Sequence, residues 1–174
     1  STANEGNYFI DFKNFERLVA FDPGVDEIFL VLVISEVVTP TEYDKKIAEK
    51  LMRKVAKGKK IKPLSIIFKS NLGRDFSSVQ QGLKLVLNEC IESDASCLIV
   101  NRSGFGPFHE NWYKQYVDLM GKTNSDLVGT TINLSGLPFD EEKEISPHIQ
   151  TYAYMGSIPF LRSVVNKFPG VNET

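Results

Sequence analysis

Apolar and polar positions along this chain follow two periods, which predict separate strands and helices. The run at 27–35 (EIFLVLVIS) is continuously apolar and rich in β-branched side chains, which is typical of a strand covered on both faces. Four apolar residues then recur at every fourth position: Tyr43, Ile47, Leu51 and Val55. This is the spacing of one helical face, and Thr41 precedes it as a suitable N-cap. The pattern predicts a buried strand followed by an amphipathic helix that ends near Ala56.

The same alternation continues to the end of the chain. Further strands are predicted at 64–68, 97–100, 126–133 and 151–155. Further helices are predicted at 77–90, 109–120 and 158–168. Near the start, 8–12 predicts a short strand and 14–19 a short helix or turn. Strands that alternate with helices predict an α/β fold, here a single domain whose mostly parallel sheet carries helices on both faces.

Length and composition limit the function classes. The chain has 174 residues, which fits one domain, and a net charge of −2 with acidic and basic residues interspersed. This balance argues against a general nucleic-acid-binding surface. The densest basic run, Lys54 to Lys62, is interpreted as a solvated linker between a helix and a strand. The longest apolar run, at 28–34, is too short for a transmembrane segment.

Cysteine usage and the chain ends bear on location and context. Cys90 and Cys97 have neither a zinc-binding nor a disulfide-framework spacing. This usage is compatible with a reducing compartment, and we expect a cytoplasmic protein. The sequence starts at Ser1 rather than methionine and ends in a polar stretch. We therefore expect flanking domains in a longer chain.

Ligands of open α/β sheets bind beyond the carboxyl ends of the strands, so the first candidate residues are those that follow the strand at 64–68. Gly73 permits a tight turn there. The planar guanidinium of Arg74 suits a phosphate, and Asp75 can accept hydrogen bonds from ribose hydroxyls or ligate a metal. Alternatively, Asp75 caps the next helix and pairs locally with Arg74. The residues alone leave these two interpretations equal.

A second group follows the strand at 97–100. Asn101 and Ser103 alternate at the strand end, so both side chains are expected on one side of the sheet, where their oxygens can share a hard cation with a diphosphate. Arg102 lies between them. Gly104 and the following glycine let a ligand approach the backbone. Alternatively, the segment is an ordinary Gly-Pro turn.

A third group surrounds the long segment at 134–147. Asn133 precedes it, and it carries an acidic run that includes Asp140 and Glu142. Irregular segments of this length are often functional. His148 follows and can act as a metal ligand, a phosphate donor or a general base. Alternatively, His148 makes a structural hydrogen bond.

Four motifs together carry a resemblance to a known family. They are Gly73-Arg74-Asp75, then Asn101-Arg102-Ser103 with Gly106-Pro107-Phe108, then Val128-Gly129-Thr130-Thr131-Ile132-Asn133, and finally Pro147-His148-Ile149-Gln150. In this order they resemble glycosyltransferase domains of the rhamnan-synthesis F type and related polysaccharide enzymes of bacteria and large viruses. The similarity covers about 65–165. It implies a GT-A-like, Rossmann-like fold.

The resemblance also implies an activity. It predicts transfer of a sugar from a UDP-, GDP- or dTDP-sugar donor to a hydroxyl of a glycan acceptor, usually with Mn²⁺ or Mg²⁺ on the diphosphate. Donor-binding residues are expected among Gly73, Arg74, Asp75, Arg102, Gly104 and Asn133. Metal ligands are expected among Asp75, Asn101, Ser103 and His148. An inverting enzyme also needs a base, for which the candidates are His148, Asp140 and Glu142.

The chain departs from the family pattern at one point. Asn101-Arg102-Ser103 stands where GT-A enzymes carry Asp-X-Asp, so neither flanking residue is a carboxylate. Metal affinity should therefore fall, and Arg102 or Arg74 could neutralise the diphosphate directly. The departure favours one alternative, a non-catalytic nucleotide-sugar-binding module of a larger synthase. Another alternative is an unrelated doubly wound domain such as a phosphatase or nucleotidyltransferase.

Overall fold

The computed structural model of the chain describes residues 8–36, 40–89, 94–104, 106–130, 132–133, 148–149 and 152–167. Its helices are α2 (Phe9–Ala20), α3 (Glu42–Val55), α4 (Arg74–Glu89), α5 (Trp112–Thr123) and α6 (Ile158–Val164), followed by the 3₁₀ turn η2 (Val165–Lys167). Its strands are β1 (Ile28–Glu36), β2 (Ile61–Ser70), β3 (Ser96–Val100), β4 (Leu127–Gly129), β5 (Ile132–Asn133), β6 (His148–Ile149) and β7 (Ala153–Ser157). The fold is mixed α/β, as predicted.

The β1–β2 pair confirms the two long strands read from the apolar runs. The strands are parallel, with Ile28 opposite Ile61 at one end and Glu36 opposite Ser70 at the other. The register shifts between Leu30 and Val31, where β2 carries Pro63. Because proline has no backbone N–H to donate to the ladder, a local irregularity is expected at this position.

Helix α3 begins where its sequence predicts. The Thr41 side chain accepts a hydrogen bond from the Asp44 backbone N–H, and the Asp44 carboxylate accepts one from the Thr41 backbone N–H at 2.8 Å. This capping box satisfies two backbone donors that a helix start leaves without partners. Ile47, Leu51 and Val55 are buried, which confirms the predicted inward face.

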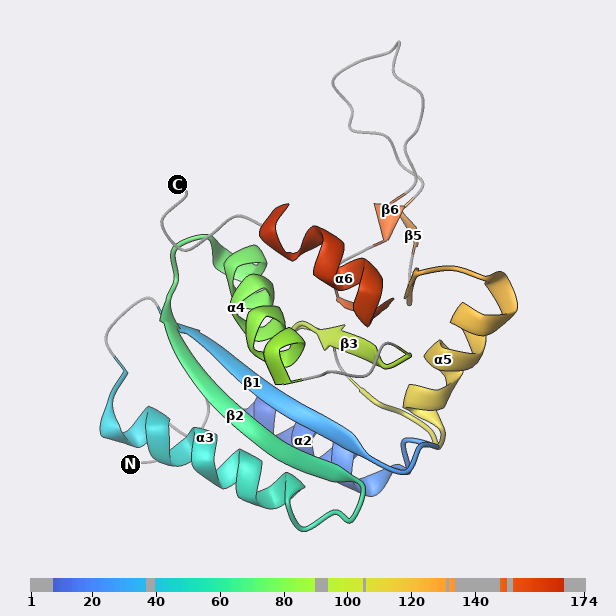
Figure 1. The fold of residues 1–174 in the computed structure, drawn as a ribbon. Coiled ribbons are helices and arrows are strands. Elements are labelled where there is room, and N and C mark those ends of the chain that lie inside the picture. Colours follow the sequence, from blue (N-terminus) through green and yellow to red (C-terminus); the bar gives the residue numbers. More distant parts are fainter. Residues whose placement is uncertain are drawn as a thin grey trace.

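Helices cover both faces of the strands (Figure 1). On one face, Phe15 of α2 and the inward side of α3 form a cluster with β1 and β2, and Leu98 of β3 packs against it. On the other face, Leu83 and Leu87 of α4 pack with Ile158 and Leu161 of α6. The neighbours of Leu98, Cys97 and Ile99, belong to this second cluster. The alternation along β3 places the strand between the two helical layers.

The described sheets differ from the predicted mostly parallel sheet. β7 lies between β3 and β4 and is antiparallel to both, and β5 pairs with β6 antiparallel. Among the strands that the structure describes, only β1 and β2 pair in parallel. The reason is that β5 and β6 form an antiparallel pair, so the chain comes back reversed before it enters the sheet as β7.

Two local predictions were wrong. The segment at 8–12 is not a strand, because Phe9–Ala20 forms one continuous helix. The basic run is not a linker as a whole, because Lys54 belongs to α3 and Lys62 to β2. The predicted strand at 126–133 is divided into β4 and β5. No helix in the described part of the chain is long and apolar enough to span a membrane.

Candidate functional site

Two of the predicted site residues, 26 positions apart, meet beyond the ends of β2 and β3. The Asn101 amide Nδ2 donates a hydrogen bond to Asp75 Oδ2 at 2.8 Å. Asp75 lies in the first turn of α4, where the helix dipole favours a carboxylate. Asn101 directly follows β3. Two residues that follow separate strands therefore lie in contact here.

Gly73 shapes the turn that delivers Asp75. Its φ of 69° lies in the left-handed region, which favours glycine. α4 begins at the next residue, and the Ser77 backbone N–H bonds the Gly73 carbonyl at 3.1 Å. The fully buried Ser77 hydroxyl donates to the Leu72 carbonyl at 2.6 Å. The predicted tight turn is confirmed, and Asp75 is a first-turn residue rather than the cap.

Lys69, a residue that the sequence pattern does not single out, supports this turn through its side chain. Its side chain is buried, and Nζ donates to Ser35 Oγ at 3.0 Å and to the Leu72 carbonyl at 3.2 Å. Burial lowers the pKa of Lys69, and the nearby Asp75 carboxylate opposes that shift. The available signal was a lysine at the end of an otherwise apolar strand. Lys69 ties β1, β2 and the turn together.

Asn101 to Gly104 forms a turn rather than a continuation of β3. The Gly104 backbone N–H donates to the Asn101 carbonyl at 2.8 Å, and the Asn101 N–H donates to the Tyr152 carbonyl at 2.9 Å. The predicted strand-like alternation of Asn101 and Ser103 was therefore wrong, because β3 ends at Val100. Instead, the Ser103 N–H approaches Asn101 Oδ1 at 3.4 Å.

The backbone near Tyr152 passes so close to position 104 that only glycine fits there without a shift. A Cβ atom placed on it would lie 2.6 Å from the Tyr152 carbonyl oxygen and 3.1 Å from the Asn101 carbonyl oxygen. The sequence predicted that this glycine admits a ligand. The approach seen here is that of the chain entering β7.

Arg102 forms a two-pronged ion pair with α2. Its Nε lies 2.9 Å from Asp11 Oδ1, and Nη2 lies 2.9 Å from Asp11 Oδ2. The Asn14 amide donates to the Arg102 carbonyl at 3.3 Å. Nearby, the Arg17 guanidinium lies 4.6 Å from the ring centroid of Phe108. To neutralise a diphosphate, Arg102 would have to break its ion pair with Asp11 or contact both groups at once.

The remaining predicted residues lie at or beyond the edge of the described structure. Asn133 in β5 and His148 in β6 are backbone partners in one antiparallel register, so two predicted site residues lie side by side along the sheet. Asp140 and Glu142 lie outside the described residues. The side chain of Arg74 also lies outside them, although its backbone begins α4.

The fit of a divalent metal can be judged from the donors present. Asp75 contributes a carboxylate, and Asn101 turns its amide Nδ2 toward Asp75 and its Oδ1 toward the Ser103 N–H. Within the described residues, no group of three or more His, Cys, Asp and Glu side chains is placed to hold a metal. Mg²⁺ often binds through one or two carboxylates together with substrate phosphates. The residues therefore fit an ion shared with a diphosphate better than an all-protein cage.

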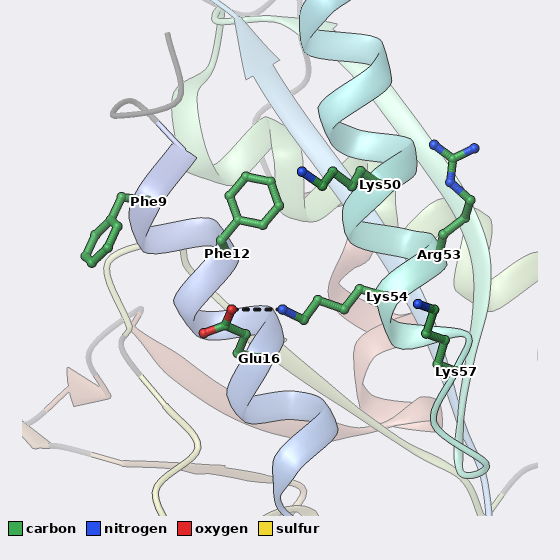
Figure 2. Close-up of a pocket in the computed structure, with 7 residues that line it drawn as sticks. All are labelled: Phe9, Phe12, Glu16, Lys50, Arg53, Lys54 and Lys57. Atoms are coloured by element: carbon green, nitrogen blue, oxygen red, sulfur yellow. Dashed lines mark hydrogen bonds and ion pairs between the residues drawn. The ribbon is translucent and has the colours of Figure 1, made fainter. Parts of the chain in front are cut away.

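A hollow of about 660 Å³ lies away from this site, between α2 and α3 (Figure 2). α2 contacts both regions through different residues. Asp11 and Asn14 contact the segment after β3, whereas Phe9, Phe12 and Glu16 line the hollow. By helical spacing, these two groups point to opposite sides of α2.

Comparison with known proteins adds no relative to this picture. No family model matches the chain, and no curated protein or solved structure matches it either. Any functional role for Asp75 and Asn101 therefore depends on their chemistry and on the order of the motifs in this sequence.

Proposed function

We propose that this chain is the nucleotide-sugar-binding domain of a glycosyltransferase with a GT-A-like fold, acting on a glycan acceptor. The observation that carries the proposal is the contact between Asp75 and Asn101. These residues belong to two separate motifs of the resemblance, and they meet at 2.8 Å. A local N-cap role for Asp75 would not require a residue from another strand to reach it.

In this proposal, Asp75 binds the donor, either through its ribose hydroxyls or through a divalent ion on the diphosphate. A bound Mn²⁺ or Mg²⁺ would supply positive charge to the departing diphosphate. Asn101 orients the Asp75 carboxylate through its amide. Lys69 holds the turn and adds a buried positive charge near it. The hydrogen bonds of Asn101 and Lys69 hold these groups within the fold, so little reorganisation is needed when charge develops.

Proton removal from the acceptor hydroxyl is assigned to the region of β5 and β6. His148 is the first candidate because its strand partner is Asn133, another residue of the resemblance. An imidazole has a pKa near neutrality and can accept the proton. Asp140 and Glu142 remain the other candidates for this base.

The alternative is a module that binds the donor without turnover. One observation favours it: Arg102, which occupies the centre of the Asn-Arg-Ser segment, is already paired with Asp11. With no carboxylate flanking Arg102, this segment offers fewer anionic ligands than Asp-X-Asp for a metal ion on the diphosphate.

A thermal-shift titration against UDP-, GDP- and dTDP-sugars, each with and without Mn²⁺, tests donor binding. A ligand at about a hundred times its dissociation constant adds about 2.7 kcal/mol to the free energy of unfolding. We expect this gain for one nucleotide family, its loss in Asp75→Asn, and its retention in Asp118→Asn, which changes the same charge on α5. Equal stabilisation of both variants would remove Asp75 from the site.

Sugar transfer to a glycan acceptor then separates the two functions. The enzyme function is supported if the chain transfers sugar and if His148→Ala abolishes this transfer while its donor-induced stabilisation is unchanged. Donor binding with no turnover supports the module. The absence of stabilisation by every donor contradicts both.

A further inference from the structure

Positive charge in this chain is concentrated in one segment. Nine of the 20 Lys and Arg residues lie at 45–62, where Glu49 is the single acid. The rest of the chain carries 11 basic and 21 acidic residues. A nearly neutral protein therefore contains one strongly positive region on an acidic body, a distribution that is typical of binding to an anionic surface.

Helix α3 organises part of this charge into a stripe. Lys50, Arg53 and Lys54 follow the spacing i, i+3 and i+4, which places them on one side of the helix axis, and Lys57 in the turn after α3 lines the same hollow. The side of α3 next to the stripe is buried through Ile47, Leu51 and Val55, so the stripe runs along the edge of the packed face.

Two aromatic side chains of α2 lie beside the stripe: Phe9 is exposed and Phe12 is half-buried. Figure 2 shows Phe12 pointing from α2 toward Lys50 of α3, with Phe9 on the outer side of the same helix, and both residues line the hollow. Phe9 is 62% exposed, a large apolar side chain to leave in water at the start of a helix. Lys50 Nζ lies 5.0 Å from the ring centroid of Phe12. We call this surface the α2–α3 face: Phe9, Phe12, Lys50, Arg53, Lys54 and Lys57.

The protein neutralises the charge of this face only in part. Lys54 pairs with Glu16 at 2.9 Å, and Arg53 lies 3.9 Å from Glu49. Among the described residues, neither Lys50 nor Lys57 has a carboxylate partner. These lysines combine long apolar stems with a charged end, so they can lie along an interface while their ammonium groups reach anions.

We propose that the α2–α3 face binds an anionic lipid membrane. A soluble polyanion would satisfy the cations but leave Phe9 in water. A bilayer accommodates both, because anionic headgroups attract the lysines and apolar side chains enter the headgroup boundary. The acidic remainder of the chain repels a long polyanion that extends past the face, whereas a planar surface contacts this face alone.

This orientation leaves the candidate site accessible. Asp11 and Asn14 contact the segment after β3 from the other side of α2, so docking through Phe9 and Phe12 does not cover Asp75. Membrane binding and donor binding can therefore be measured separately, and neither depends on the other.

Vesicle sedimentation tests the proposal. The whole chain is mixed with phosphatidylcholine vesicles or with vesicles in which about a third of the lipid is phosphatidylserine. We expect binding to the anionic vesicles only, weakened by salt as the charges are screened. In Lys50→Gln/Arg53→Gln/Lys57→Gln, the partition coefficient should fall about a hundredfold, at roughly fivefold for each cation.

The matched control is Lys84→Gln/Lys122→Gln/Lys167→Gln, which removes the same charge from exposed positions on α4, α5 and η2. It should bind anionic vesicles nearly as the unchanged chain does. Phe9→Ser should also weaken vesicle binding. Circular dichroism and thermal unfolding of each variant verify that it folds, which is expected because all the substituted residues lie at the surface.

Three results would overturn the proposal. The first is no sedimentation with anionic vesicles, and the second is equal loss in the two triple variants. The third is that the chain binds inorganic polyphosphate as tightly as it binds vesicles and that Phe9→Ser does not change vesicle binding. That result would make the face a polyanion site. Donor-induced stabilisation that persists in the α2–α3 triple variant distinguishes failure of this proposal from failure of the proposed function.

Discussion

Replacement of Gly104 by alanine tests how tightly the turn after β3 is held. The added Cβ would lie 2.6 Å from the Tyr152 carbonyl oxygen, a backbone atom that cannot rotate away. An ordinary contact requires the two segments to separate by roughly half an ångström or more. The same carbonyl accepts the Asn101 N–H at 2.9 Å, so the separation stretches this hydrogen bond. The turn that carries Asn101 should therefore shift.

The loss in the free energy of unfolding can be estimated from these contacts. Overpacking contributes about 1–3 kcal/mol, and the weakened backbone hydrogen bond about 1 kcal/mol. Because Gly104 does not have a left-handed backbone, alanine also restricts the unfolded chain, which returns about 0.4–1 kcal/mol. The net loss is about 1–3.6 kcal/mol, and the melting temperature should fall by roughly 2–14 °C for a chain of this length.

Gly121→Ala is the matched control because a Cβ there meets nothing within 4 Å. It lies in α5, where alanine is favoured over glycine by about 0.4–1 kcal/mol. Urea unfolding and differential scanning calorimetry measure both variants. The reasoning is refuted if Gly104→Ala is as stable as Gly121→Ala. A destabilised Gly104→Ala that binds donor normally would show that the position of Asn101 does not matter for binding.

Two further predictions concern charges. Burial, together with the neighbouring Cys97, raises the pKa of Tyr154 to about 12. An unfolded tyrosine ionises near pH 10, so the stability due to Tyr154 should be fully present below about pH 10 and should fall as the pH rises towards 12. In urea unfolding, Tyr154→Phe should lose less stability at alkaline pH than the unchanged chain does. An equal loss in both would contradict the burial argument. For Arg102 and Asp11, a double-mutant cycle with alanine should give a coupling free energy of about 1 kcal/mol. This is the upper end of the range for exposed pairs, because the contact is two-pronged. A coupling free energy of zero would mean that the pair does not form in solution.

The elements that the sequence predicted correctly are those whose local pattern permits one structure. The β1 run is too apolar for a surface helix and too short for a transmembrane segment. The α3 pattern combines a four-residue apolar spacing with a capping threonine, and both Thr41 and Val55 occupy their predicted roles. In each case, local propensity and burial favour the same structure.

Helix α2 shows where local pattern fails. Tyr8 to Phe12 is an aromatic and β-branched run, which indicates a strand when taken alone. The structure instead buries Phe15 against α3, and this packing requires a helix. The error concealed part of the site, because only a helix brings Asp11 and Asn14 onto one side, where both contact the turn after β3. The direction of β7 was beyond prediction for a similar reason, since a strand's apolar pattern is the same in both directions.

The candidate site depends on contacts that are remote in sequence. The Asn101–Gly104 turn is held by Asp75 from α4, by Asp11 and Asn14 from α2, and by the Tyr152 carbonyl at the entry to β7. Each partner comes from a different part of the chain, so no window of sequence could reveal the arrangement. A turn restrained from three sides positions its polar groups before a ligand arrives, which is the condition under which fixed dipoles contribute most to binding and catalysis. If the donor-binding function holds, substitutions of Asp11 should weaken donor binding without contacting the donor, because Asp11 acts through Arg102 on the position of this turn.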